Sequence, residues 1–141
     1  MGSIRHQVSI RVPATDLYHA ISTETGIGSW WDKPDTVRSE AGTVLEFRPG
    51  PGHGVLKMKV LINTRDRHVE WECISTHAKS SPASAWTGTH VIFEISEQDG
   101  TSVLNFRHTG WDEDNEYFAF CNYNWGVALQ KLKLHCESRN S

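Results

Sequence analysis

The sequence predicts an α+β protein, in which a curved antiparallel sheet of about six strands wraps around one long C-terminal helix and two short helices follow the first strand. Six segments alternate apolar and polar residues with the period of two that marks half-buried strands. The turns between the later strands are too short for parallel crossovers, which need a dozen or more residues. The last segment repeats apolar residues every three or four positions, which is the helical period.

The N-terminal elements are a strand and two short helices. In residues 4–12 (IRHQVSIRV) the side chains alternate between an apolar and a polar side, with His6 on the apolar side, and this pattern predicts a half-buried strand. Pro13 stops the strand and suits the start of a helix within residues 14–23 (ATDLYHAIST). The two glycines of TGIGSWWD break a long helix but permit a second short one that ends near Trp31.

Five more strands are expected between these helices and the C-terminal helix. They span residues 43–48, 54–63, 68–75, 88–97 and 101–111. Asp99-Gly100 is the strongest hairpin signal, because both residue types accept the positive φ of a tight turn. Residues 41–43 (AGT) and 63–68 (NTRDRH) mark two further reversals. The alternation predicts one sheet with one face in water.

Two connections are longer or richer in glycine and proline than a hairpin needs. They are residues 48–54 (RPGPGHG) and residues 76–88 (THAKSSPASAWTG). The two prolines of the first loop remove backbone donors that a phosphate would need, which favours an ordinary hairpin connection there. Loops of this kind are functional about as often as they are simply mobile, so both interpretations stay open.

The C-terminal segment predicts a long amphipathic helix. Its apolar residues fall at spacings of three and four: Phe118, Cys121, Trp125, Ala128, Leu132 and Cys136. Asp114 or Asn115 can cap the helix N-terminus, where Glu113 and Glu116 are also favoured by the helix dipole.

Composition narrows the class of protein. A chain of 141 residues fits a single domain over residues 1–141. The net charge of −3 and the scattered lysines and arginines argue against nucleic acid as a partner. Apolar runs fall well short of the ~20 residues of a membrane span. Three distant cysteines without a Cys-x-x-Cys pair, and no secretion signal, predict a reduced, cytoplasmic protein.

Histidine is the residue type that could carry chemistry. The eight histidines show no ligand-like spacing, so we expect no metal site, and no fingerprint for a cofactor is present. His108 shares a face with Leu104 and Phe106. It is either a core histidine held by a carbonyl or hydroxyl, or the polar handle of an apolar pocket.

The aromatic residues are the most informative feature, because they occur in nearly every predicted element. Ordinary core packing accounts for many of them. Stiff indoles nevertheless fill the uneven space between a curved sheet and a helix less easily than leucine or isoleucine does. A cavity in this space is therefore the natural alternative to a solid core.

The order of elements resembles the START-like, helix-grip superfamily. The segments TDLYHAISTETGIGSWWD, VEWECI, GTHVIFEI, TSVLNFRHTGW and NWGVALQKLK carry this resemblance. The chain looks most similar to the subfamily called activator of heat-shock protein 90 ATPase homologue, whose single-domain bacterial members are also known as SRPBCC proteins. The resemblance implies a deep hydrophobic cavity between the sheet and the long helix.

The resemblance also implies which residues line that cavity. They are Trp30 and Trp31 from the second short helix, Met58, Val60, Trp71, Phe93, Phe106 and His108 from the sheet, and Phe118, Cys121 and Trp125 from the long helix. The family offers no universal catalytic residue to transfer. Of the adjacent tryptophans, we expect one to cap the cavity or core and the other to pack at its rim.

The sequence leaves three functions open. The leading one is a binding or carrier module for a small hydrophobic or aromatic ligand. The alternative is an enzyme of cyclase, dehydratase or hydrolase type that acts on a hydrophobic substrate in the same cavity, with His108 as general acid or base. A chaperone-interaction module ranks last, and a homodimer remains an open alternative.

Overall fold

The computed structural model describes residues 2–139 of the chain, with side chains through Ser138. Its strands are β1 (Gly2–Ile10), β2 (Asp35–Ser39), β3 (Gly42–Phe47), β4 (Leu56–Thr64), β5 (His68–Cys73), β6 (His90–Gln98) and β7 (Thr101–Trp111). Its helices are α1 (Ala14–Ser22), α2 (Glu24–Gly28), the short 3-10 helix η1 (Pro82–Ala85) and the long α3 (Phe118–Arg139). The predicted α+β class and the two short helices after the first strand are confirmed.

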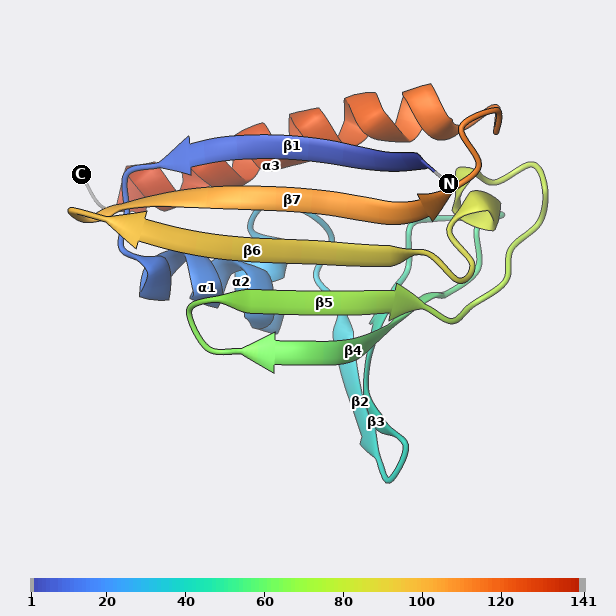
Figure 1. The fold of residues 1–141 in the computed structure, drawn as a ribbon. Coiled ribbons are helices and arrows are strands. Elements are labelled where there is room, and N and C mark those ends of the chain that lie inside the picture. Colours follow the sequence, from blue (N-terminus) through green and yellow to red (C-terminus); the bar gives the residue numbers. More distant parts are fainter. Residues whose placement is uncertain (1, 140–141) are drawn as a thin grey trace.

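The strands form one curved antiparallel sheet in the order β1-β7-β6-β5-β4-β3-β2. Strands β2 to β7 are neighbours in chain order, as in an antiparallel meander. Strand β1 pairs with β7, so the chain must cross the sheet between β1 and β2. Helices α1 and α2 make this crossing, and α3 lies on the same side of the sheet along β1 and β7 (Figure 1).

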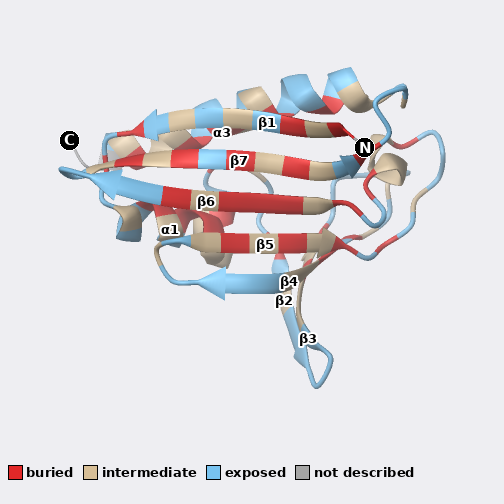
Figure 2. Cartoon of the chain, viewed as in Figure 1, coloured by how far each residue is buried: buried red, intermediate tan, exposed pale blue. Residues whose placement is uncertain are grey.

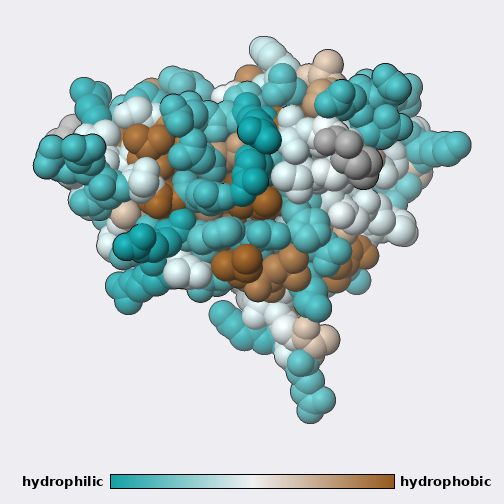
Figure 3. All heavy atoms as spheres, in the orientation of Figure 1, coloured by the Kyte–Doolittle hydropathy of each residue, from teal (hydrophilic) through white to brown (hydrophobic). Residues whose placement is uncertain are grey.

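The sheet has one buried face and one solvent-facing face, as the alternation predicts. In β5, for example, Val69, Trp71 and Cys73 are buried while the residues between them are half-exposed. Figure 2 shows this mixture of buried and partly exposed residues along the central strands. The outer face is mainly hydrophilic, with separate small hydrophobic patches (Figure 3). The helices therefore pack against one face only.

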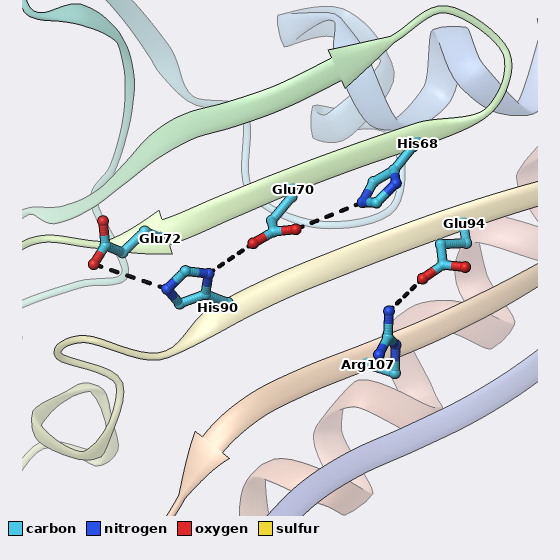
Figure 4. Close-up of polar contacts among 6 residues, drawn as sticks. All are labelled: His68, Glu70, Glu72, His90, Glu94 and Arg107. Carbon is cyan, nitrogen blue, oxygen red and sulfur yellow. Dashed lines mark hydrogen bonds and ion pairs between the residues drawn. The ribbon is translucent and has the colours of Figure 1, made fainter.

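Charged side chains cover the outer face by pairing across strands (Figure 4). The Oε2 atom of Glu70 on β5 lies 2.7 Å from Nδ1 of His90 on β6, and His68, on the same strand as Glu70, lies 3.6 Å from its other carboxylate oxygen. Arg107 on β7 pairs with Glu94 on β6. Such cross-strand pairs are typical of a solvated sheet face.

The sheet has seven strands, one more than the sequence analysis expected. The additional strand β2 has four exposed residues and one half-buried residue, so no apolar alternation marks it. Its pairing with β3 through the turn at residues 40–41 makes it a strand. The other turns are as predicted: Asp99 and Gly100 have φ values of 55° and 79°, and Asp66 in the reversal after β4 has 63°.

Helix α3 buries residues at spacings of three and four: Cys121, Trp125, Leu129, Leu132 and Cys136. Asn115 stabilises the turn that leads into α3: its Oδ1 accepts a hydrogen bond of 2.8 Å from the backbone N–H of Tyr117. The described residues include no helix that is both long and apolar enough to cross a membrane.

Candidate functional site

A pocket of about 700 Å³ lies along α3, on the side of the helix that faces the end of α2 and the two long loops. Its lining combines the segment after α2, the loop between β3 and β4, the η1 segment and one side of α3. The lining residues are Ser29, Trp30, Trp31, Asp32, Phe47, Pro49, His53, Leu56, Ser81, Pro82, Ala83, Trp86, Phe120, Cys121, Asn124, Trp125, Val127, Ala128 and Lys131.

Four indoles form the apolar wall of the pocket: Trp30, Trp31, Trp86 and Trp125. Trp31 stacks on Trp30 with ring centroids 6.0 Å apart and on Trp86 at 6.1 Å. Trp86 stacks on Trp125 at 5.6 Å, with an interplanar angle of 20°. Trp31 also contacts Phe47, another residue of the lining, at a centroid distance of 4.7 Å. The wall is therefore a continuous set of ring contacts that one flat molecule can join.

The sequence around α2 explains how two adjacent tryptophans reach this wall. Thr23 caps α2 by accepting a hydrogen bond of 2.9 Å from the N–H of Gly26. A Cβ atom at residue 26 would lie 2.2 Å from the carbonyl oxygen of His19, so only glycine lets α2 pack this closely against α1. Helix α2 ends at Gly28, and the turn that follows presents Trp30 and Trp31.

The two tryptophans have different surroundings, although both line the pocket. Trp30 is 3% exposed and its Nε1–H donates a hydrogen bond of 2.8 Å to the carbonyl oxygen of Ala20. Trp31 is half-buried and lies between Phe47, Trp71 and the other indoles of the wall. Trp30 is thus fixed to α1, whereas Trp31 forms the centre of the wall.

His108 lies behind the wall and is hydrogen-bonded to one of its indoles. The Nε1–H of Trp125 donates to His108 Nδ1 at 3.0 Å, so Nδ1 is the unprotonated nitrogen. His108 Nε2 is 2.7 Å from the Thr89 hydroxyl, which donates to the carbonyl oxygen of Trp86 at 2.5 Å. Burial, with a smaller contribution from nearby His90, lowers the pKa of His108 to about 3. His108 is therefore a neutral core histidine.

A second polar group, formed by His53 and Ser81, belongs to the pocket itself. His53 Nδ1 lies 2.6 Å from Ser81 Oγ, and Ser81 is only 1% exposed. The Ser81 hydroxyl also accepts from the N–H of Ala83, because Ser81 caps η1. His77 contacts the carbonyl oxygen of His53 at 2.6 Å and so holds this loop against the segment after β5. The pocket thus has an indole wall and one fixed polar corner.

The pocket brings together four of the eleven residues that the resemblance suggested: Trp30, Trp31, Cys121 and Trp125. The other seven, namely Met58, Val60, Trp71, Phe93, Phe106, His108 and Phe118, lie outside the lining. Met58, Trp71, Phe93, Phe106 and His108 are at most 1% exposed and pack in the core beneath the wall. Val60 packs partly buried against that core, and Phe118 packs edge-on against Trp111.

Sequence reasoning missed the polar corner and Trp86. His53 lies in residues 48–54, and Ser81 and Trp86 lie in residues 76–88. The unusual composition of these two loops was the available signal, and it did not identify individual side chains. No group of three or more His, Cys, Asp or Glu side chains within the described range could hold a metal ion.

A curved antiparallel sheet that holds a long C-terminal helix, with a pocket between the helix and the loops, defines a helix-grip protein. The model of the family described as "Activator of Hsp90 ATPase homolog 1-like protein" matches residues 11–137. The chain belongs to this family, in agreement with the resemblance seen in the sequence. A search of curated proteins finds no match.

Solved structures of similar proteins have the same fold. The solution structure of the Aha1 dimer from Colwellia psychrerythraea is 27% identical, with 97% of each chain covered and a TM-score of 0.79. Protein MLL2253 from Mesorhizobium loti is 18% identical, with 99% of each chain covered and a TM-score of 0.80. Protein SSP2350 from Staphylococcus saprophyticus is 14% identical, with 96% of this chain and 92% of SSP2350 covered and a TM-score of 0.74.

Proposed function

We propose that the protein binds a small, flat, hydrophobic or aromatic molecule in the pocket along α3. The observation that carries this proposal is the wall of four indoles around a space of about 700 Å³. This volume falls within the range of about 300–1,000 Å³ that is usual for small-molecule sites. An aromatic ring of the ligand would continue the offset ring contacts that already connect Trp31, Trp86 and Trp125.

The polar corner narrows the class of ligand further. His53 and Ser81 hold each other at 2.6 Å in a largely apolar lining, so they are positioned before any ligand arrives. A ligand hydroxyl or carbonyl beside them would gain a hydrogen bond without reorganising the site. We therefore favour an aromatic ligand with one hydrogen-bonding group over a pure hydrocarbon.

The enzyme alternative receives less support from these contacts. Both ring nitrogens of His108 have hydrogen-bonding partners, and His108 is absent from the lining. Ser81 and His53 are within hydrogen-bonding distance, but Ser81 is only 1% exposed, so its hydroxyl is poorly placed to attack a substrate as a nucleophile. The pair favours recognition, and chaperone interaction remains the lowest-ranked proposal.

The test is a binding measurement with 2-naphthol, a flat aromatic probe with one hydroxyl, compared with naphthalene. Tryptophan fluorescence and calorimetry should show saturable binding of 2-naphthol by the wild-type chain, and weaker binding of naphthalene. Ala128→Phe fills the pocket from α3 and should abolish binding, whereas Ala119→Phe, on the same helix but outside the lining, should not. His53→Ala should remove the preference for 2-naphthol.

Two outcomes would contradict the proposal. The first is binding of neither probe by a wild-type chain that circular dichroism shows to be folded. The second is undiminished binding in folded Ala128→Phe, since this result would place the ligand elsewhere.

A further inference from the structure

The hydrogen bonds of the polar corner determine where its hydrogens lie. Ser81 Oγ has two hydrogen-bonding partners: the backbone N–H of Ala83 at 3.2 Å and Nδ1 of His53 at 2.6 Å. The N–H of Ala83 can only donate, so it occupies one lone pair of the oxygen. The hydroxyl hydrogen of Ser81 therefore has Nδ1 of His53 as its one remaining partner among the described residues.

Burial decides which of the two groups donates. Ser81 is 1% exposed, and a buried hydroxyl without an acceptor is costly. If Nδ1 of His53 carried a hydrogen, it would donate to Ser81 and leave the hydroxyl hydrogen unpaired. Nδ1 is therefore the acceptor, and a neutral imidazole with an unprotonated Nδ1 carries its hydrogen on Nε2. His53 is in the Nε2–H form.

The Nε2–H group of His53 is the hydrogen-bond donor that the corner offers to a ligand. His53 belongs to the pocket lining, and its Nδ1 is occupied by Ser81. Nε2 has no partner in the part of the chain that the structure describes. It is also not among the buried polar atoms that lack a partner, so it is open to solvent or to a ligand. The oxygen of Ser81 keeps a lone pair, but burial closes it off.

A second histidine, His77, holds the loop of His53 and has the opposite tautomer. Its Nδ1 lies 2.6 Å from the carbonyl oxygen of His53, which can only accept, so Nδ1 of His77 carries a hydrogen. Its Nε2 lies 2.7 Å from Ser75 Oγ, which in turn accepts the N–H of Lys57 at 2.9 Å. Nε2 of His77 is thus the acceptor for the Ser75 hydroxyl. These contacts hold the backbone at residue 53, so its donor is positioned before a ligand binds.

The other polar side chains of the lining do not select between ligand groups in this way. Ser29, Asp32, Asn124 and Lys131 are all exposed. An exposed side chain can turn toward water when a ligand offers it no partner, so a mismatch there costs little. The Nε2–H of His53 is held by its neighbours, so a ligand has to match it. The pocket therefore prefers a hydrogen-bond acceptor at the polar corner.

We propose that the pocket selects an aromatic carbonyl compound, whose oxygen accepts the Nε2–H of His53 while its ring joins the indole wall. A carbonyl oxygen only accepts, so it leaves no hydrogen of its own unpaired in a largely apolar lining. A phenol would have to find an acceptor for its hydrogen, and a carboxylate would give up more hydration. This ligand class rests on the proposed function, whereas the tautomer of His53 does not.

The first test determines the tautomer in the ligand-free chain. A long-range nitrogen–proton NMR spectrum at about pH 8, where an ordinary histidine is neutral, separates protonated from unprotonated ring nitrogens. His53 should carry its hydrogen on Nε2 and His77 on Nδ1. Ser81→Ala should return His53 to a mixture of tautomers, whereas Ser22→Ala, which removes a hydroxyl from α1 outside the lining, should not. Circular dichroism should show both variants folded. A hydrogen on Nδ1 of His53 would overturn the proposal.

The second test measures the binding of two naphthalenes that have nearly the same shape. The ketone 2-acetonaphthone has a carbonyl oxygen where 2-isopropenylnaphthalene has a methylene group. Calorimetry gives the ratio of their dissociation constants, and comparing this ratio between variants cancels the difference in ligand hydration. His53→Phe should shift the ratio against the ketone by about threefold to tenfold, the range expected for one hydrogen bond. His19→Phe, at an exposed residue outside this lining, should leave the ratio unchanged.

A donor pair, indole and indene, completes the test. The polar group of indole can only donate, so the wild type and His53→Phe should show the same ratio of dissociation constants for this pair. A preference for indole that depends on His53, or a ketone ratio that His53→Phe does not change, would overturn the carbonyl preference while the pocket remains a ligand site. If none of the four compounds binds the folded chain, the proposed function is contradicted as well.

Discussion

The buried His108 predicts a specific dependence of stability on pH. In the folded chain Nδ1 accepts the indole N–H of Trp125, and the ring is 0% exposed. Protonation would place two N–H groups against each other in a region closed to bulk solvent. Burial would also strip the imidazolium of its hydration, and this is the main physical reason why the pKa falls from 6.5 in an exposed histidine to about 3 here, with a smaller contribution from His90.

The sign and size of the effect follow from proton linkage. Between about pH 6.5 and about pH 3 the unfolded chain holds a proton on this imidazole that the folded chain does not hold. The free energy of unfolding therefore falls as the pH is lowered through this window. Each pH unit well inside it costs about 1.4 kcal/mol, and the whole window costs roughly 5 kcal/mol, comparable with the stability of a small domain.

Urea unfolding followed by tryptophan fluorescence measures this slope. His108→Gln keeps an acceptor near Trp125 but does not titrate, so its stability should fall less steeply than that of the wild type. The difference between the two slopes should be about 1.4 kcal/mol per pH unit between about pH 6 and pH 5. The same substitution at exposed His19 is the control and should reproduce the wild-type slope. Equal slopes in the wild type and His108→Gln would refute the reasoning.

Three further predictions concern the core and the segments that support the pocket. Measured by urea unfolding, Trp30→Phe should cost about 1–3 kcal/mol more stability than Trp111→Phe. The indole N–H of Trp30 donates to the carbonyl oxygen of Ala20, whereas the buried Nε1–H of Trp111 has no acceptor within the described part of the chain. Equal costs would show that the hydrogen bond contributes little. Gly26→Ala should lower the free energy of unfolding by at least 2 kcal/mol, because the added Cβ would clash with backbone atoms of α1. The control is Gly52→Ala: a Cβ there would have no atom within 4 Å, so the substitution should cost about 1 kcal/mol for the positive φ alone. A tolerated Gly26→Ala would argue against the close packing of α2 on α1. Burial raises the pKa of the Cys73 and Cys121 thiols, so a thiol reagent should modify them slowly in the native chain and rapidly in denaturant. Fast native modification would contradict their buried positions.

The fold was predictable because its strands alternate clearly and its turns carry the expected residues. Asp99-Gly100 and the reversal around Asp66 adopt positive φ values at the predicted positions. Strand β2 escaped prediction because it lies at the sheet edge with mostly exposed residues, so burial imposed no pattern on it. Its pairing with β3 is a tertiary fact that local sequence does not encode.

The pocket was predictable only in part. The indoles of α3 and of the segment after α2 were identified, since their elements had to face the sheet. The sheet residues Trp71 and Phe93 pack against each other at 5.0 Å, and Trp31 occupies the space above Trp71. This packing fills the interior and leaves the pocket at the edge of α3. The polar corner of His53 and Ser81 depends on how two loops meet, and no periodic pattern describes such a meeting.

The most direct test of the central claim is the indole region of a nitrogen–proton NMR spectrum during titration with 2-naphthol. The chain has six tryptophans, of which Trp30, Trp31, Trp86 and Trp125 line the pocket, while Trp111 lies outside its lining. If the pocket is a ligand site, the indole signals of the lining residues should shift with a saturable concentration dependence while the Trp111 signal stays in place. Signals that do not move, or a Trp111 signal that moves as much as the others, would contradict it.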